Sequence, residues 1–126
     1  MSSERTIQML HRVLDEFNEH DVDAIMTHFA EDCVFDAPRG PDPWGRRFVG
    51  KAEVRSGLSA RFDGIPDVHY AEADHFACGT RGVSEWTITG TDLGRDRIEV
   101  RGCDLWTIGH DGKIVRKDSF WKLREA

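Results

Sequence analysis

Apolar residues recur with a helical period in the first half of this chain and with the two-residue period of a β-strand in the second. Up to Gly64 they are spaced three and four residues apart, and from Pro66 onward the apolar runs are separated by turn residues. Helices that come first and strands that come later favour an α+β fold. We therefore predict three N-terminal helices packed on one face of a curved antiparallel sheet.

Three amphipathic helices are expected before the strands begin. The spacing of apolar residues places them at residues 7–17, 22–29 and 50–64. Between the second and the third, a short strand at 33–35 runs into a segment that holds three of the chain's four prolines. Because proline and glycine interrupt regular structure, this segment, 36–45, predicts a long irregular loop. We expect the part from Pro38 to Phe48 to border the entrance of a pocket.

Four strands are expected in the second half, at 67–78, 82–90, 98–108 and 113–123. Asp111 and Gly112 predict a tight hairpin turn between the last two. The chain has no linker or internal repeat, and its 126 residues suit one domain that covers residues 1–126.

Charge and composition exclude several kinds of partner. The net charge is −6 and basic residues are interleaved with acidic ones, so we expect no nucleic-acid binding. The apolar runs are short and the first residues are polar, which predicts no membrane span, no signal peptide and a cytoplasmic protein. The three cysteines lie far apart and the six histidines show no ligand spacing, so we expect reduced thiols, no metal and no cofactor.

One carboxylate stands on an otherwise apolar strand face. Alternate residues of the strand at 98–108 share a face, and Asp104 is the only charged residue among them. A buried carboxylate must be paired, hydrogen-bonded or protonated, because its burial without partners costs several kcal/mol. Asp104 is therefore either in a salt bridge with Arg101, Arg116 or Lys117, or a group that lines a pocket.

A second carboxylate, Asp36, ends the short strand just before the proline-rich segment. From there it can reach the mouth of a cavity, or it can bond to the backbone of its own turn. Trp44 lies in the same segment, where it has little core to fill, so we expect it to be a lid or a dimer contact. Arg46 and Arg47 follow it, either to hold an anionic group or to lie in solvent.

Four short segments carry a resemblance: NEHDVD at 18–23, AEDCVFDAPRG at 30–40, CDLW at 103–106 and GKIV at 112–115. In element order and spacing, nearly the whole chain resembles the ketosteroid isomerases and the wider SnoaL-like group of the nuclear transport factor 2-like superfamily. The resemblance implies a cone-shaped α+β barrel and, as in many relatives, a homodimer.

The same resemblance implies roles for the two carboxylates. Asp36 falls at the position of the base that moves a proton between carbons, and Asp104 at that of the acidic donor to the enolate oxygen. We therefore predict that Asp104 is largely buried and faces the same cavity as Asp36. The phenolic donor of those isomerases would fall at Val13, while the only tyrosine, Tyr70, lies elsewhere.

Two other segments, KDSF at 117–120 and SEWT at 84–87, resemble parts of the limonene epoxide hydrolases. That resemblance implies that Asp118 and Glu85 activate water against an epoxide carbon. A late aspartate is also the acid and base of SnoaL-like polyketide cyclases, which again points to Asp118.

The ligand itself is expected to be a small hydrophobic molecule held by aromatic and apolar side chains. We expect His28 to donate a hydrogen bond to this molecule. The residues expected to contact the ligand are Val13, Phe17, His28, Trp44, Trp86, Trp106 and Phe120.

The sequence thus favours a cofactor-independent enzyme that acts on a small hydrophobic carbonyl compound, as an isomerase or a cyclase, by carboxylate-mediated proton transfer. The first alternative is a limonene-type epoxide hydrolase or cyclase that uses Glu85 and Asp118. The second is a non-catalytic domain that binds a small ligand or dimerises. Turnover of an unsaturated ketone or of an epoxide would separate the two enzymes, and ligand binding without product would favour the non-catalytic domain.

Overall fold

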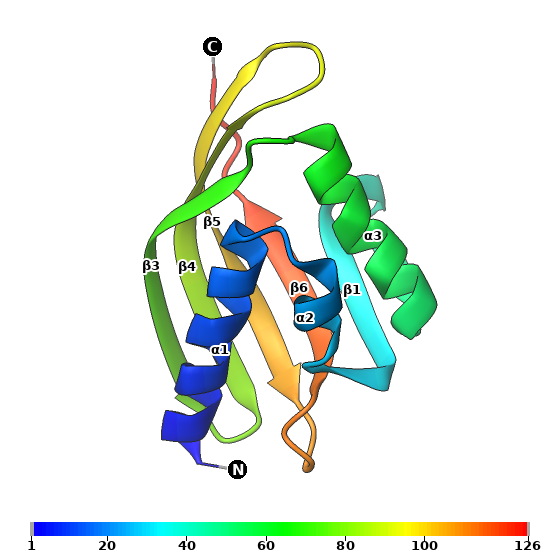
Figure 1. Ribbon diagram of the computed structural model, residues 1–126, viewed down its shortest axis with the longest axis vertical. Helices are drawn as coiled ribbons and strands as arrows, with labels where there is room; N and C mark the ends of the chain where they lie inside the picture. The colour runs from blue at the N-terminus through cyan, green and yellow to red at the C-terminus, as the bar shows by residue number, and fades with distance from the viewer. Residues whose placement is uncertain (1, 126) are drawn as a thin grey trace.

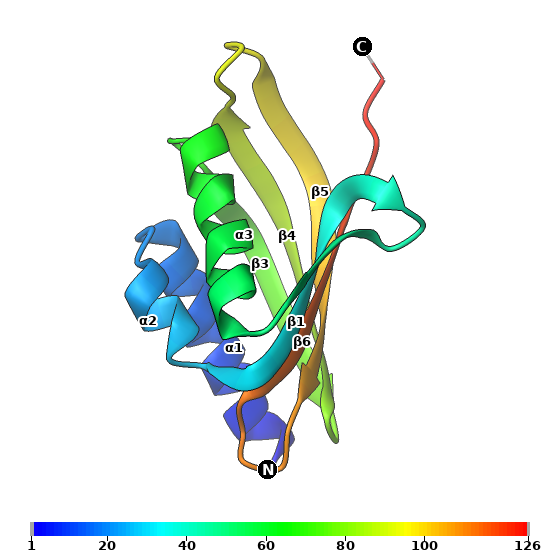
Figure 2. The same cartoon turned by 90° about the vertical axis from the view of Figure 1, so that its right-hand side faces the viewer.

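The computed structural model describes residues 2–125 as three helices and six strands. The helices are α1 (Ser3–Asn18), α2 (Val22–Met26) and α3 (Lys51–Gly64). The strands are β1 (Phe29–Asp42), β2 (Gly45–Val49), β3 (His69–Cys78), β4 (Arg81–Thr91), β5 (Arg97–Ile108) and β6 (Ile114–Trp121). All three helices lie on one side of a curved sheet, as Figure 1 and Figure 2 show. The predicted α+β class is confirmed.

The six strands form a single sheet in the order β2-β1-β6-β5-β4-β3. Neighbouring strands are antiparallel except for β1 and β6, which run parallel. The prediction of a wholly antiparallel sheet is therefore wrong at this pair, because β1 and β6 come from opposite ends of the chain and are not joined by a hairpin. No helix within residues 2–125 is long and apolar enough to cross a membrane.

The proline-rich segment is a strand and hairpin instead of the irregular loop that the sequence predicts. β1 continues to Asp42, and the chain then turns back as β2. The ladder between these strands is broken between Ala37 and Asp42, which is where prolines, having no backbone donor, are tolerated. Gly45 has a φ of 88° at the reversal, a conformation that glycine adopts without steric cost.

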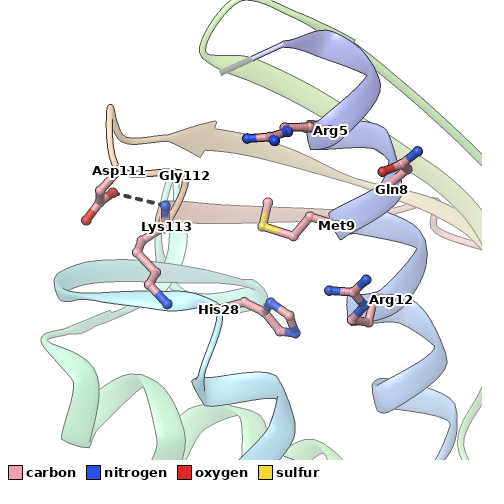
Figure 3. A pocket seen from close by; sticks show the side chains of 8 residues that line it. All are labelled: Arg5, Gln8, Met9, Arg12, His28, Asp111, Gly112 and Lys113. Carbon is pink, nitrogen blue, oxygen red and sulfur yellow. Dashed lines mark hydrogen bonds between the residues drawn. The ribbon is translucent and has the colours of Figure 1, made fainter.

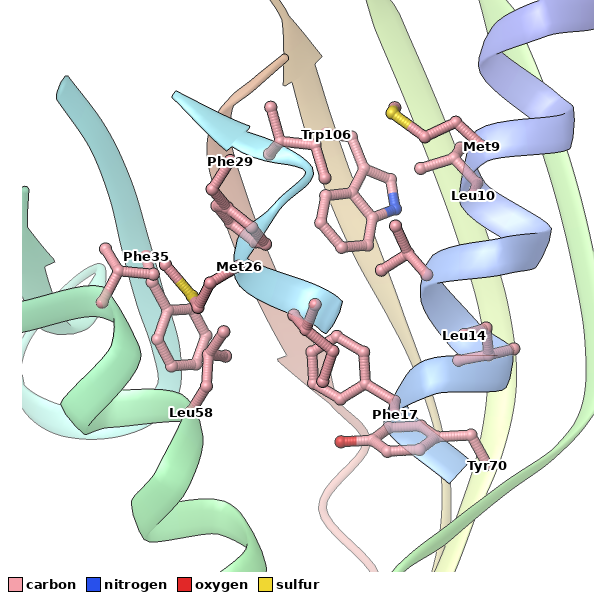
Figure 4. Close-up of a cluster of buried hydrophobic side chains, with 14 of the residues drawn as sticks. Met9, Leu10, Leu14, Phe17, Met26, Phe29, Phe35, Leu58, Tyr70 and Trp106 are labelled. Atoms are coloured by element: carbon pink, nitrogen blue, oxygen red, sulfur yellow. The ribbon is translucent and has the colours of Figure 1, made fainter. Parts of the chain in front are cut away.

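The core lies between α1 and the inner face of the sheet. The stripe predicted on the first helix is confirmed, since Leu10, Val13 and Phe17 are all buried. They pack with Trp106 of β5 and other buried residues in one cluster, part of which is shown in Figure 4. The second helix is shorter than predicted, because α2 ends at Met26 and residue 29 already belongs to β1.

Candidate functional site

The candidate site lies on the inner face of the sheet, where three strands bring polar side chains into one row. Ser84 of β4, Asp104 of β5 and Ser119 of β6 are direct cross-strand partners. Since alternate residues of a strand share a face, the apolar face predicted for β5 points toward the helices. Asp104 is 3% exposed, so the prediction that its carboxylate is buried is confirmed.

The Asp104 carboxylate accepts three hydrogen bonds. Its Oδ1 accepts from Lys117 Nζ at 2.6 Å and from Ser119 Oγ at 2.5 Å. Among residues 2–125, its Oδ2 accepts only from Trp86 Nε1, at 3.1 Å, which leaves a lone pair of this oxygen unused. The salt bridge predicted for Asp104 is confirmed, since its partner is Lys117. The gap that Asp104 borders between α1 and the sheet has no room for a water, and its role in a pocket stays a prediction.

Lys117 is the cation of this buried pair, and we call Asp104 and Lys117 the inner pair. The Lys117 side chain is only 5% exposed. Its ammonium lies 5.4, 4.9 and 5.5 Å from the ring centroids of Phe17, Phe35 and Trp106. Burial lowers the pKa of Lys117, and the negative charge of Asp104 opposes this shift. An ammonium in this setting can donate to an oxyanion that forms during a reaction.

Two further polar groups approach the inner pair from β3 and α3. Tyr70 and Arg61 line a small cavity together with Lys117. The Tyr70 ring packs edge-on against Phe17, with the hydroxyl directed into the interior (Figure 4). Burial raises the pKa of the Tyr70 phenol, and the nearby Arg61 charge opposes the rise. The phenol is therefore neutral near pH 7 and available as a donor.

The cavity lined by Lys117, Tyr70 and Arg61, which we call the inner cavity, is small and adjoins a much larger one. Around Lys117 and Tyr70 it leaves about 10 Å³, room for at most one water. A cavity of about 1090 Å³ opens at the end of the cone, between α3, the β1–β2 hairpin, the start of β5 and the segment after β6. We call it the mouth. Phe35, Arg61 and Trp121 border both cavities, and the Arg61 guanidinium lies 4.4 Å from the Trp121 ring centroid.

Asp36 lies on the opposite face of the sheet from Asp104. Its neighbour Phe35 points inward and lines the small cavity, so Asp36 points outward. Asp36 is fully buried there, because its carboxylate accepts two hydrogen bonds from Arg47, at 2.8 and 3.1 Å, and one from Arg116 at 2.5 Å. The prediction that Asp36 and Asp104 face the same cavity is therefore wrong.

Glu85 and Asp118 also point away from the inner cavity. They alternate along β4 and β6 with Ser84 and Ser119, which face inward. Neither acid lines the mouth or the cavities beside the inner pair. The water-activating pair implied by the resemblance to epoxide hydrolases is therefore not assembled around these cavities.

Three of the residues expected to contact a ligand lie away from the inner pair. Phe120 is 49% exposed on the outer face, and Trp44 is 46% exposed at the tip of the β1–β2 hairpin, beneath the Arg47 guanidinium. His28 bonds to Glu16 at 2.7 Å and borders a surface pocket between α1 and the β5–β6 turn (Figure 3). The expected lid role of Trp44 has no support, because Trp44 does not line the mouth.

The other four expected contacts surround the inner pair. Val13, Phe17 and Trp106 line the closely packed gap that Asp104 borders, and Trp86 lines the small cavity that Lys117 borders. Their contact with a ligand stays a prediction. The β1–β2 hairpin lines the mouth with Pro38 and Phe48 among others, which confirms that this segment borders a cavity entrance.

Sequence reasoning missed Tyr70 and Arg61 and treated Lys117 only as one of three partners for Asp104. Tyr70 falls within the first strand predicted after Pro66, where Val68 and Tyr70 alternate with the polar Asp67 and His69, a pattern that favours an inward position. The sequence holds no comparable signal for Arg61, since its proximity to Tyr70 depends on how α3 crosses the sheet.

A separate buried network next to this site predicts an acid sensitivity of the fold. His75 Nδ1 lies 2.7 Å from Ser84 Oγ, which also accepts from Trp106 Nε1 at 2.9 Å. Either the Ser84 hydroxyl or the ring N–H supplies the proton of this contact. Within residues 2–125, Nε2 is buried without a hydrogen-bond partner, so a protonated ring would gain no bond there. Burial and the nearby His11 lower the pKa of His75 below its ordinary 6.5.

Stability should therefore fall as the pH drops below 6.5, because the unfolded chain then binds a proton that folded His75 does not. The slope reaches about 1.4 kcal/mol per pH unit while only the unfolded form is protonated. Urea unfolding at a series of pH values from about 7.5 to about 5 measures this slope of the unfolding free energy. His75→Phe should flatten the profile and the exposed His110→Gln should not. Equal profiles for the wild type and His75→Phe would contradict this assignment.

Three helices on one side of a six-stranded sheet that curls around an inner cavity define a nuclear transport factor 2-like protein. The chain belongs to the SnoaL-like domain family, whose model matches residues 10–117. No protein of curated function matches the sequence at a significant level.

Several solved structures share the fold. A proposed polyketide cyclase from Xanthomonas campestris pv. campestris is 23% identical, with a TM-score of 0.83 over 95% of this chain and 92% of its own. A nuclear transport factor 2-like protein of unknown function from Mesorhizobium loti is 28% identical, with a TM-score of 0.79 over 96% and 93%. A proposed ketosteroid isomerase from Kribbella flavida is 19% identical, with a TM-score of 0.77 over 98% and 82%.

Proposed function

We propose that this chain is a cofactor-independent enzyme that moves a proton on a small hydrophobic carbonyl compound, as an isomerase or a cyclase. The observation that carries the proposal is the inner pair, a buried Asp104 carboxylate and Lys117 ammonium that face aromatic side chains. Buried ionisable pairs beside a cavity are common at catalytic sites. The proposed cyclase and isomerase among the structural neighbours support the same class of chemistry.

In this proposal Asp104 replaces Asp36 as the base. The free lone pair of Asp104 Oδ2 takes a proton from the carbon next to the substrate carbonyl, and the electron pair of that C–H bond moves to the carbonyl oxygen as an enolate. The Lys117 ammonium and the Tyr70 hydroxyl stabilise the enolate oxygen by hydrogen bonds. In an isomerase, Asp104 then returns the proton to another carbon of the enolate. In a cyclase, the enolate carbon attacks a second carbonyl carbon of the same substrate, the electron pair of that C=O π bond moves to its oxygen, and Asp104 returns the proton to the resulting alkoxide.

The walls of the inner cavity support this division of roles. Phe17, Phe35 and Trp106 exclude water around the Lys117 ammonium, and charges act more strongly where water is absent. The inner cavity leaves only about 10 Å³, which is too little for a substrate. Arg61 and Trp121 stack at the border between this cavity and the mouth, so a substrate that enters from the mouth has to displace the stack. We therefore propose that this stack opens when substrate binds.

Deuterium exchange tests the proposed reaction without knowledge of the natural substrate. The enzyme is incubated in D₂O with a β,γ-unsaturated cyclic ketone, its carboxylated analogue or an alicyclic epoxide, and proton NMR follows the α-hydrogen and the products. We expect loss of the α-proton signal at least about 10²-fold faster than in buffer for one of the ketones. Diol formation from the epoxide without ketone exchange would favour the epoxide hydrolase.

The small volume of the inner cavity favours one other function, a non-catalytic domain that binds a ligand in the mouth. A cavity of about 1090 Å³ can hold such a ligand without any change at the inner pair. Ligand-induced stabilisation of the fold with neither exchange nor product would support this second function over the first.

A further inference from the structure

The mouth carries a positive charge although the chain as a whole is negative. Its basic lining residues are Arg39, Arg46, Arg61, Arg97, Lys122 and Arg124. Its acidic ones are Asp92, Glu99 and Glu125. The lining therefore has a formal charge of +3, with six basic against three acidic residues, in a chain of net charge −6. A concave surface of one sign concentrates ligands of the other sign.

Most of these cations have no carboxylate partner. Within residues 2–125, Arg124 is the only basic lining residue of the mouth that forms a salt bridge, to Glu99 at 3.7 Å. On the outer face, by contrast, Arg47 and Arg116 both pair with Asp36. The cations that face the mouth are therefore free to bind an external anion.

Arg61 is the most deeply placed of these free cations. It is partly buried at the inner end of the mouth, with its guanidinium on the Trp121 ring at 4.4 Å. Its charge affects both Tyr70 and Lys117, which places it beside the groups that would meet a substrate carbonyl. A guanidinium suits a carboxylate, because its planar fork can donate two parallel hydrogen bonds.

We propose that the mouth selects an amphipathic anion, namely an aromatic or alicyclic carbonyl compound that carries a carboxylate, and that Arg61 binds this carboxylate. The apolar body would contact Phe48, Val100 and Trp121, which line the same cavity. This inference rests on the proposed function only in that the ligand carries a carbonyl group. The preference for an anion follows from the mouth and does not require catalysis.

A matched pair of unreactive ligands tests the preference. Isothermal titration calorimetry compares 2-naphthoate with 2-naphthamide, which share shape and apolar area and differ in charge. We expect naphthoate to bind the wild type about tenfold more tightly. Arg61→Gln should remove most of this difference, and Arg81→Gln, an exposed arginine outside the mouth, should preserve it.

Salt dependence gives a second measurement on the unchanged protein. Naphthoate affinity should fall severalfold as NaCl rises from about 20 to about 300 mM, while naphthamide affinity stays constant. Equal affinities for the two ligands, no binding of naphthoate at millimolar concentration, or a preference that Arg61→Gln leaves intact would overturn the inference. Because neither ligand reacts, these outcomes are independent of deuterium exchange, which alone tests the proposed function.

Discussion

Replacement of Asp104 by asparagine should slow α-proton exchange by about 10²- to 10⁴-fold, the usual contribution of a general base. The amide is nearly isosteric with the carboxylate and can still accept a hydrogen bond from Trp86, but it cannot take a proton from carbon. Asp118→Asn, on the outer face, should leave the rate within about twofold. The NMR exchange assay measures all three proteins.

The comparison needs a folded Asp104→Asn protein, which circular dichroism can verify. Folding is favoured at mildly alkaline pH, because burial has already lowered the pKa of Lys117 and the amine can be neutral beside the amide. Tyr70→Phe supplies an independent arm, since loss of one donor to the enolate should cost about tenfold or more in rate. An Asp104→Asn protein with normal exchange, together with a slow Asp118→Asn protein, would move the chemistry to the outer face.

The position of Asp104 could be predicted from the sequence because the two-residue period of β5 is unambiguous. Its neighbours on that face are apolar or glycine, and an error of one residue would have placed them all in solvent. The same rule gives no answer for β1, because Cys33, Val34 and Phe35 are all apolar and no alternation marks the inner face. Only the structure shows that Cys33 and Phe35 are the buried ones, which directs Asp36 outward.

The partner of Asp104 was harder to predict, because a β-bulge changes the register of the last hairpin. Ile108 pairs with Ile114, but Thr107 pairs with Arg116. Without this extra residue, Arg116 would lie opposite Trp106 on the inner face and Lys117 would point outward. A bulge has no firm sequence signature, and here one residue decides which cation is buried.

The contacts of Arg61 and Tyr70 are beyond sequence patterns for a different reason. They come from α3 and β3, and only tertiary packing brings them beside β6. The burial of Asp36 is a similar case. It requires the β1–β2 hairpin, which places Arg47 of β2 directly opposite Asp36, whereas the prolines of this segment predict an irregular loop. The sequence therefore predicts the face of a strand with clear alternation, such as β5, and predicts poorly the groups that meet across elements.

The inner pair should also have a large effect on stability, which Lys117→Met can measure. Methionine fills a similar volume but leaves the Asp104 carboxylate buried without its counter-charge. Loss of one partner from a buried ion pair costs about 3–5 kcal/mol. Urea unfolding followed by tryptophan fluorescence should therefore show a marked fall in the midpoint at unchanged slope.

The double variant Asp104→Asn/Lys117→Met separates the cost of an unpaired charge from the cost of altered packing. It contains no buried charge at this position. Its amide oxygen, in the place of Oδ2, can accept from Trp86 Nε1, and its amide nitrogen, in the place of Oδ1, can donate to Ser119 Oγ. We expect it to be more stable than Lys117→Met by about 2 kcal/mol or more, since neutral replacements of a buried pair are often tolerated. If both proteins were equally destabilised, the loss would come from packing around Phe17, Phe35 and Trp106. A Lys117→Met protein as stable as the wild type would mean that water reaches Asp104, and the dry inner cavity on which the proposed chemistry depends would not exist.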